Sequence, residues 1–228
     1  GKSLADYMVE PKLSANGVEF VLAPEISLDM DILRPLSQPH QPNGGLAILS
    51  GNLGRAVIKI SAVDPTYHRI TAPAAVFDNE AEVKTAFKEG RLNGDVAVVV
   101  RLQGPQANGM PELHSLTPIL SSLQQKGHAV MLITDGRMSG ASGRVPAALH
   151  LTPEAINGGA IGAICNGDMI TIDVASGRLS VEADLSQRPQ ASSKPFEGGF
   201  GRELFSNMRE QAASAEAGGG INLLWRYQ

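Results

Sequence analysis

The sequence predicts an α/β domain whose mixed, barrel-like β-sheet is flanked by helices, with an extended arm at each end. Short apolar runs alternate with helical segments without a strict repeat, and a strand–helix–strand stretch is followed by a hairpin pattern. The expected parts are an arm or linker at 1–43 that comes from a missing N-terminal domain, the barrel-like domain at 44–185, and a tail at 186–228 with one helix. The arm is rich in proline and is expected to have little regular structure.

The first elements of the domain are three short strands and a helix. Residues 44–51 and 56–63 are β-branched runs bounded by Gly and Asp-Pro, which indicates strands, and 72–77 has the same character. Residues 78–90 predict a helix, because Asp78 can cap its start and a glycine ends it.

The next elements form the strand–helix–strand stretch. The nearly continuous apolar run at 94–102 suits a strand that is covered on both faces, and 128–134 is a second such strand. Between them, Thr117 as the cap and Pro118 at the first position begin a helix over 117–127. A unit of this length places its strands parallel and close, with both carboxyl ends at one edge.

The remaining elements are predicted by weaker sequence patterns. Thr-Pro begins a short helix over 152–159, and alternating apolar residues predict a hairpin over 167–184. A helix over 201–216 is expected in the tail.

Composition excludes several classes of protein. The net charge of the 228 residues is −4 and no basic run occurs, so nucleic acid is not an expected partner. No apolar stretch approaches the roughly 20 residues that a membrane helix needs. Cys165 is the only cysteine, so an intrachain disulfide is impossible and a reducing, cytoplasmic location is favoured. One cysteine also cannot hold an iron–sulfur cluster, which needs several thiolates. We interpret Cys165 as a small buried apolar residue.

Two loops follow the buried strands, and each contains candidate functional residues. The loop at 104–114 presents one carboxylate, Glu112, just before a helix. It is either a solvated residue near a helix N-terminus or a ligand for Mg²⁺, which prefers hard oxygen donors.

The second loop, "TDGRMSGASGR", joins glycines to Ser139 and two arginines. Glycines let backbone N–H groups approach an anion, and Arg137 and Arg144 can each grip a carboxylate or phosphate. A flexible turn with solvated arginines is the alternative reading. The position of both loops at the carboxyl ends of strands favours a site, because the ligand sites of open α/β sheets gather there.

Four segments occur here in the order in which a known family has them: "GGLAILSGNLGRAVIKISAV", "GDVAVVVRLQGPQANGMPEL", "LITDGRMSGASGRVPAALHLTPEA" and "GGAIGAICNGDMITID". Together they resemble the C-terminal domain of the dihydroxy-acid and 6-phosphogluconate dehydratase family. The resemblance implies a swivelling-type β-barrel flanked by helices. Relatives that act on non-phosphorylated acids have a longer loop before "GMPE" and "TRG" after the Ser-Gly, where this chain has "ASGRVPAA". The difference favours a substrate with an extra anion.

The resemblance implies that 6-phosphogluconate is dehydrated to 2-keto-3-deoxy-6-phosphogluconate, as in the Entner–Doudoroff route of gluconate metabolism. It implies Ser139 as the base, Glu112 as a Mg²⁺ ligand, and an iron–sulfur cluster, expected as 4Fe–4S, held by the missing N-terminal domain. We expect Arg137, Ser142 and Arg144 to bind the phosphorylated sugar acid. A homodimer is expected, and this fragment alone is expected to be inactive.

Two alternatives stay open at this point. The chain could belong to a dehydratase of another sugar acid or dihydroxy acid, or it could be an anion-binding module without catalysis.

Overall fold

The computed structural model describes residues 3–24, 26–139, 143–192 and 202–221. The chain forms two units, Gly1–Gly44 and Gly45–Gln228. The second unit carries both candidate loops.

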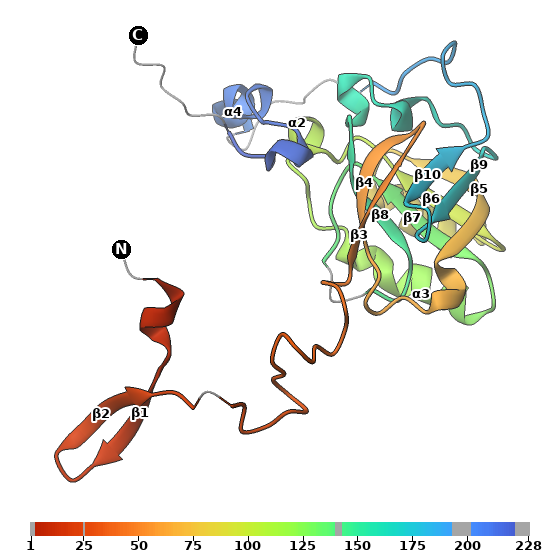
Figure 1. Ribbon diagram of the computed structural model, residues 1–228. Helices are drawn as coiled ribbons and strands as arrows, with labels where there is room; N and C mark the ends of the chain where they lie inside the picture. Colours follow the sequence, from red (N-terminus) through yellow and green to blue (C-terminus); the bar gives the residue numbers. More distant parts are fainter. Residues whose placement is uncertain (1–2, 25, 140–142, 193–201, 222–228) are drawn as a thin grey trace. The chain divides into compact units, whose positions relative to one another are not determined.

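The first unit contains a hairpin, so the expectation of little regular structure at 1–43 was wrong for this part. A 3₁₀ helix, η1 (Leu4–Tyr7), precedes the antiparallel strands β1 (Val9–Ser14) and β2 (Gly17–Leu22) (Figure 1). The alternation of Val18, Phe20 and Leu22 is the period-2 signal of a strand.

The second unit is built on a closed barrel of eight strands in the order β10-β3-β4-β8-β7-β6-β5-β9. Strands β5 to β8 are parallel to their neighbours in this run, whereas β3–β4, β4–β8, β5–β9 and β9–β10 pair antiparallel. The predicted mixed, barrel-like sheet is confirmed. The strands are β3 (Leu46–Gly51), β4 (Gly54–Lys59), β5 (Arg69–Phe77), β6 (Val96–Val100), β7 (Val130–Thr134), β8 (Ala147–Thr152), β9 (Met169–Asp173) and β10 (Arg178–Val181).

The helices of this unit are short. The α-helices are α1 (Glu80–Lys88), α2 (Pro105–Asn108), α3 (Thr117–Gln125) and α4 (Ser206–Glu210). The 3₁₀ helices are η2 (Pro65–Tyr67), η3 (His114–Leu116), η5 (Ala155–Asn157), η6 (Ala160–Ala163), η7 (Arg202–Phe205) and η8 (Ala215–Ala217). Among the described residues, none of these helices is long and apolar enough to cross a bilayer.

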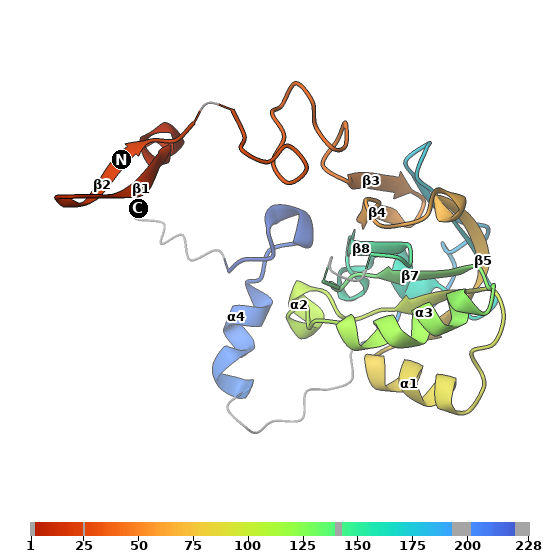
Figure 2. The same cartoon turned by 90° about the horizontal axis from the view of Figure 1, so that it is seen from below.

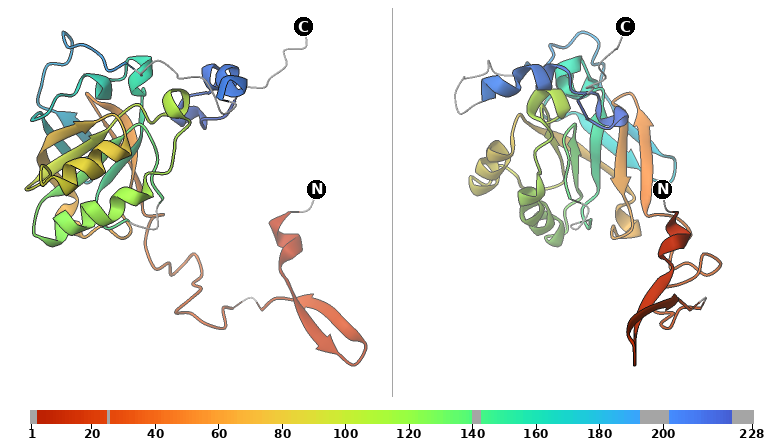
Figure 3. Two further views of the ribbon diagram at one scale, coloured as in Figure 1. Left: turned by 180° about the vertical axis from the view of Figure 1, so that it is seen from behind. Right: turned by 90° about the vertical axis from the view of Figure 1, so that its left-hand side faces the viewer.

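The core has two layers. One fills the barrel and includes Leu49, Val99 and Ile133, and the other lies between the outer face of β5–β7 and the helices, where it includes Leu120 and Leu132. Helices α1 and α3 lie on the same side of the barrel, while β3 and β4 lie on the opposite side (Figures 2 and 3). All residues of β6 and β7 are buried because these strands face apolar side chains on both sides.

The structure confirms the strand–helix–strand stretch and corrects its details. Strands β6 and β7 are parallel and adjacent, with Val98 opposite Leu132. Thr117 is the first residue of α3 rather than its cap, and the cap of α1 is Asn79 rather than Asp78. The side chain of Asn79 accepts a hydrogen bond from the backbone N–H of Glu82, and this bond caps the first turn of α1.

Three further expectations differ from the structure. The predicted helix at 152–159 was wrong, because Thr152 ends β8, a strand that was not predicted, and only the 3₁₀ helix η5 follows. The tail helix is shorter than 201–216, since in the described part of the tail α4 is preceded by the 3₁₀ helix η7 and followed by a turn and the 3₁₀ helix η8. Cys165 is exposed rather than buried, because it stands in the turn before β9.

Candidate functional site

Three loops meet at one end of the barrel. They follow β6, β7 and β8, which are parallel neighbours, so their carboxyl ends share one edge. The loop after β6 carries Glu112, the loop after β7 carries Ser139, and the loop after β8 carries Glu154.

Asp135, the first residue after β7, ties the three loops together. Its side chain is fully buried and accepts hydrogen bonds from the backbone N–H groups of Leu102 at 3.1 Å, Gln103 at 2.8 Å and Ala155 at 2.9 Å. Burial raises the pKa of the Asp135 carboxyl group, and these N–H groups oppose that rise. A buried carboxylate that is satisfied by backbone amides fixes the relative positions of the segments that supply them.

Glu154 fastens the start of α2 in the same way. Its carboxylate is buried and accepts from the backbone N–H groups of Gln106 and Ala107, both at 3.1 Å. Burial raises the pKa of Glu154, and the nearby charge of Asp135 raises it further. A Cβ on Gly104 would lie 2.6 Å from Cδ of Glu154, so only glycine leaves room for this contact.

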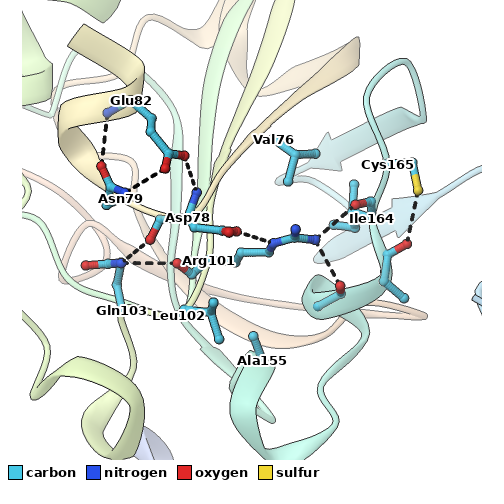
Figure 4. Close-up of polar contacts among 12 residues, drawn as sticks. Val76, Asp78, Asn79, Glu82, Arg101, Leu102, Gln103, Ala155, Ile164 and Cys165 are labelled. Atoms are coloured by element: carbon cyan, nitrogen blue, oxygen red, sulfur yellow. Dashed lines mark hydrogen bonds and ion pairs between the residues drawn. The ribbon is translucent and has the colours of Figure 1, made fainter. Parts of the chain in front are cut away.

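Polar contacts also hold the residues between β6 and α2 (Figure 4). The side chain of Gln103 donates to the carbonyl oxygens of Asp78 at 2.7 Å and of Arg101 at 3.1 Å. The Arg101 guanidinium bonds the Asp78 carboxylate at 2.7 Å and the Ile164 carbonyl at 3.3 Å. The segment that leads to Glu112 therefore starts from a fixed position.

Glu112 contacts the loop of Ser139 directly. One carboxylate oxygen accepts the backbone N–H of Ser139 at 2.6 Å, and the other accepts from the Arg137 guanidinium at 3.1 Å. Arg137 also donates to the Met110 carbonyl at 2.7 Å, and its own carbonyl accepts from the N–H of Leu113 at 3.1 Å. The prediction that the two loops meet is confirmed, and the site combines a carboxylate, a guanidinium and the serine.

The residues on either side of Arg137 anchor the loop. Met138 is buried and its sulfur accepts from the Thr117 hydroxyl at 3.7 Å. A Cβ on Gly136 would lie 2.7 Å from Cβ of Gln103, so glycine permits this loop to approach the segment that follows β6. The Gly136 carbonyl accepts from the N–H of His150 at 2.9 Å.

The structure does not bring Arg144, another predicted binding residue, into contact with this cluster. Arg144 is exposed and lines a separate hollow of about 390 Å³ with Asp64 and Tyr67. Its carbonyl accepts from the side chain of Gln124 in the last turn of α3, about 10 Å along that helix from its first residue, Thr117. Ser142 lies outside the described residues.

Sequence reasoning missed Asp135, Glu154 and His150. A lone acid directly after an apolar strand was the available signal for Asp135, but burial of its carboxylate depends on amides from two other loops. Nothing in the sequence marks His150, which has a positive φ of 56° in β8. Burial lowers the pKa of its imidazole, and the charge of Arg137 adds to this effect.

The donor atoms on this chain fit a shared metal site and do not fit an iron–sulfur cluster. Glu112 offers carboxylate oxygens with further lone pairs, and Mg²⁺ often takes only one or two protein carboxylates. Within the described ranges no group of three or more His, Cys, Asp or Glu side chains could hold a metal ion. The single Cys165 cannot supply the several thiolates of a cluster.

Comparison with known proteins gives a consistent result. The family model "Dihydroxy-acid/6-phosphogluconate dehydratase C-terminal" matches residues 31–219. The chain is 50% identical to a phosphogluconate dehydratase of Rhizobium meliloti over 97% of its own length and 38% of the relative's, and 52% identical to one of Zymomonas mobilis over 94% and 36%. A dihydroxy-acid dehydratase of Ignicoccus hospitalis is 38% identical over 85% of this chain and 36% of the relative. The chain thus spans little more than a third of the length of these relatives.

Proposed function

Because the chain belongs to the dihydroxy-acid/6-phosphogluconate dehydratase family, we propose that it is the C-terminal part of a hydro-lyase that acts on 6-phosphogluconate. The reaction yields 2-keto-3-deoxy-6-phosphogluconate and water, as in the Entner–Doudoroff route. The names of the relatives at 45–52% identity support this substrate. The observation that carries the proposal is the Glu112 carboxylate that joins Arg137 to the backbone of Ser139.

In this proposal the Ser139 oxygen removes the proton from C2 of the substrate. Loss of that proton and of the C3 hydroxyl group gives an enol, which tautomerises to the keto acid. The proton taken from C2 and the hydroxyl group lost from C3 together make up the water that is released. A serine alkoxide needs nearby positive charge. Arg137, two residues before Ser139 in the chain, supplies part of it, and Glu112 holds its guanidinium. In the same proposal Arg137 also binds the substrate carboxylate, since a guanidinium can donate two parallel hydrogen bonds to it.

Glu112 would be this chain's ligand to Mg²⁺. Bound there, the ion would supply the positive charge that acidifies the C2 proton and favours the serine alkoxide. The rest of the metal ligands and every thiolate ligand of an iron–sulfur cluster would come from the remaining part of the protein, which is also the first partner of this chain. We propose a homodimer in the cytoplasm as the working form.

Turnover by the intact protein tests the assignment. Ser139→Ala should lower kcat for 6-phosphogluconate by about 10²–10⁴-fold or more, since a positioned base is lost, while bound Mg²⁺ stays unchanged. Ser176→Ala, in the turn between β9 and β10, is the matched control and should have normal kcat. Near-normal turnover by Ser139→Ala would show that another group is the base. If the unaltered protein does not dehydrate 6-phosphogluconate, the proposed reaction itself is wrong, and an anion-binding module becomes the better reading.

A further inference from the structure

A hollow of about 350 Å³ lies where strands of the barrel meet the C-terminal tail. Strands β3, β4 and β8 form its floor, and η8 from the tail forms one wall. Ile48 and Val57 give it apolar sides, while Arg55, His150 and Glu216 give it polar ones. None of these side chains has a role in the proposed proton transfer.

His150 connects the hollow to the site. Its backbone N–H donates to the carbonyl of Gly136 at 2.9 Å, three residues before Ser139. Burial lowers the pKa of the His150 imidazole, and the charge of Arg137 lowers it further. The backbone hydrogen bond to Gly136 therefore links one residue of the hollow to the loop that carries Ser139.

The polar groups of the hollow suit a dianion. Arg55 has five N–H donors, and its Nη1 lies 2.9 Å from the Glu216 carboxylate. This pair is weak, because the two side chains are 59% and 45% exposed and solvent screens their attraction. An imidazole held neutral by burial still has one N–H to donate. Arginine binds phosphate through two parallel hydrogen bonds, which makes it the natural anchor here.

The substrate of the proposed reaction needs a second anion site. Its carboxylate and its phosphate lie at opposite ends of a six-carbon chain, so a substrate whose C2 lies at Ser139 must place its phosphate several bonds away. The hollow of Arg144 is a weaker candidate, because Arg144 contacts Gln124 at the far end of α3.

We propose that Arg55 and His150 bind the phosphate group of the substrate and so determine specificity for the phosphorylated acid. The proposal rests on the proposed function. Glu216 then acts against phosphate affinity, because its carboxylate competes for Arg55 and repels the dianion.

The kinetic test compares 6-phosphogluconate with gluconate in the intact protein. Arg55→Gln should raise KM for 6-phosphogluconate about 10- to 100-fold, the loss of a hydrogen-bonded charge pair, with little change of KM for gluconate. His150→Asn should act in the same direction, and asparagine tolerates the positive φ of this position. Arg91→Gln removes another exposed arginine that is paired with a glutamate, so it is the matched control and should leave both KM values near normal.

Glu216→Gln separates charge recognition from a structural role. If the hollow binds phosphate, this change lowers KM for 6-phosphogluconate while Arg55→Gln raises it. If the Arg55–Glu216 pair only stabilises the fold, both changes act in the same direction, and the proposal is wrong. Equal effects of Arg55→Gln on both substrates, or a selective effect of Arg144→Gln alone, would overturn it as well.

Binding of inorganic phosphate tests the phosphate site independently of the proposed reaction. Phosphate added to the protein should raise the NMR titration midpoint of the His150 imidazole, identified by its loss in His150→Asn, and Arg55→Gln should abolish the shift. A protein that turns over 6-phosphogluconate but shows neither the shift nor the KM selectivity refutes only the inference. A protein with the phosphate-induced shift and no dehydratase activity refutes only the proposed reaction.

Discussion

Replacing Glu112 with glutamine should loosen the backbone at Ser139. The carboxylate accepts the Ser139 N–H at 2.6 Å and the Arg137 guanidinium at 3.1 Å, and these contacts join the loops after β6 and β7. A glutamine side chain has one acceptor oxygen in place of two, so its NH₂ group must face one of the two donors. The loop that holds Ser139 then opens more often.

The magnitude follows from the type and exposure of these bonds. Hydrogen bonds to a charged group contribute about 1.5–3 kcal/mol each. The Glu112 side chain is 33% exposed and that of Arg137 is 51% exposed, so solvent screens the ion pair and reduces the expected loss to about 1–2 kcal/mol in local opening. That loss corresponds to amide exchange at Ser139 that is about 5- to 30-fold faster.

Amide hydrogen exchange followed by NMR measures this change at Ser139. Glu89→Gln is the matched control, because Glu89 follows α1 and its exposed side chain pairs with Arg91 at 2.7 Å. The control should leave exchange at Ser139 unchanged, and the amides of β6 and β7 should stay protected in both variants. Unchanged exchange at Ser139 in Glu112→Gln would refute the reasoning that this carboxylate holds the loops together.

Two further predictions concern the buried acids. Asp135→Ala leaves three buried N–H groups without their acceptor, so the free energy of unfolding in urea should fall by about 3–5 kcal/mol; a change below about 0.5 kcal/mol, as expected for the exposed Asp184→Ala, would contradict this. Burial raises the pKa of Glu154 above its ordinary value of 4.5, so its carboxyl group stabilises the fold while protonated, and this contribution is lost as the pH rises through the raised pKa. In Glu154→Gln the free energy of unfolding should therefore fall less steeply with pH above pH 4.5. A slope equal to that of the unaltered protein would show that Glu154 does not cause the fall.

The sequence by itself determined the central part of the fold. The apolar runs of β6 and β7 and the proline and glycine that delimit α3 are local signals, and a helix of this length between two strands leaves few arrangements other than parallel neighbours. The meeting of the Glu112 and Ser139 loops follows from that geometry. The specific motifs also led to the family, because they occur in its order.

Tertiary structure alone decided how the barrel closes and what surrounds the site. The pairing of β10 with β3 and of β5 with β9 joins segments far apart in the chain, and β8 has no clear apolar alternation that would mark it as a strand. Burial of Asp135 depends on N–H groups from two other loops, and the Arg55–His150 hollow depends on which strands are neighbours. A local pattern predicts an element, but the environment of a charge is set by residues that only the closed barrel brings to it.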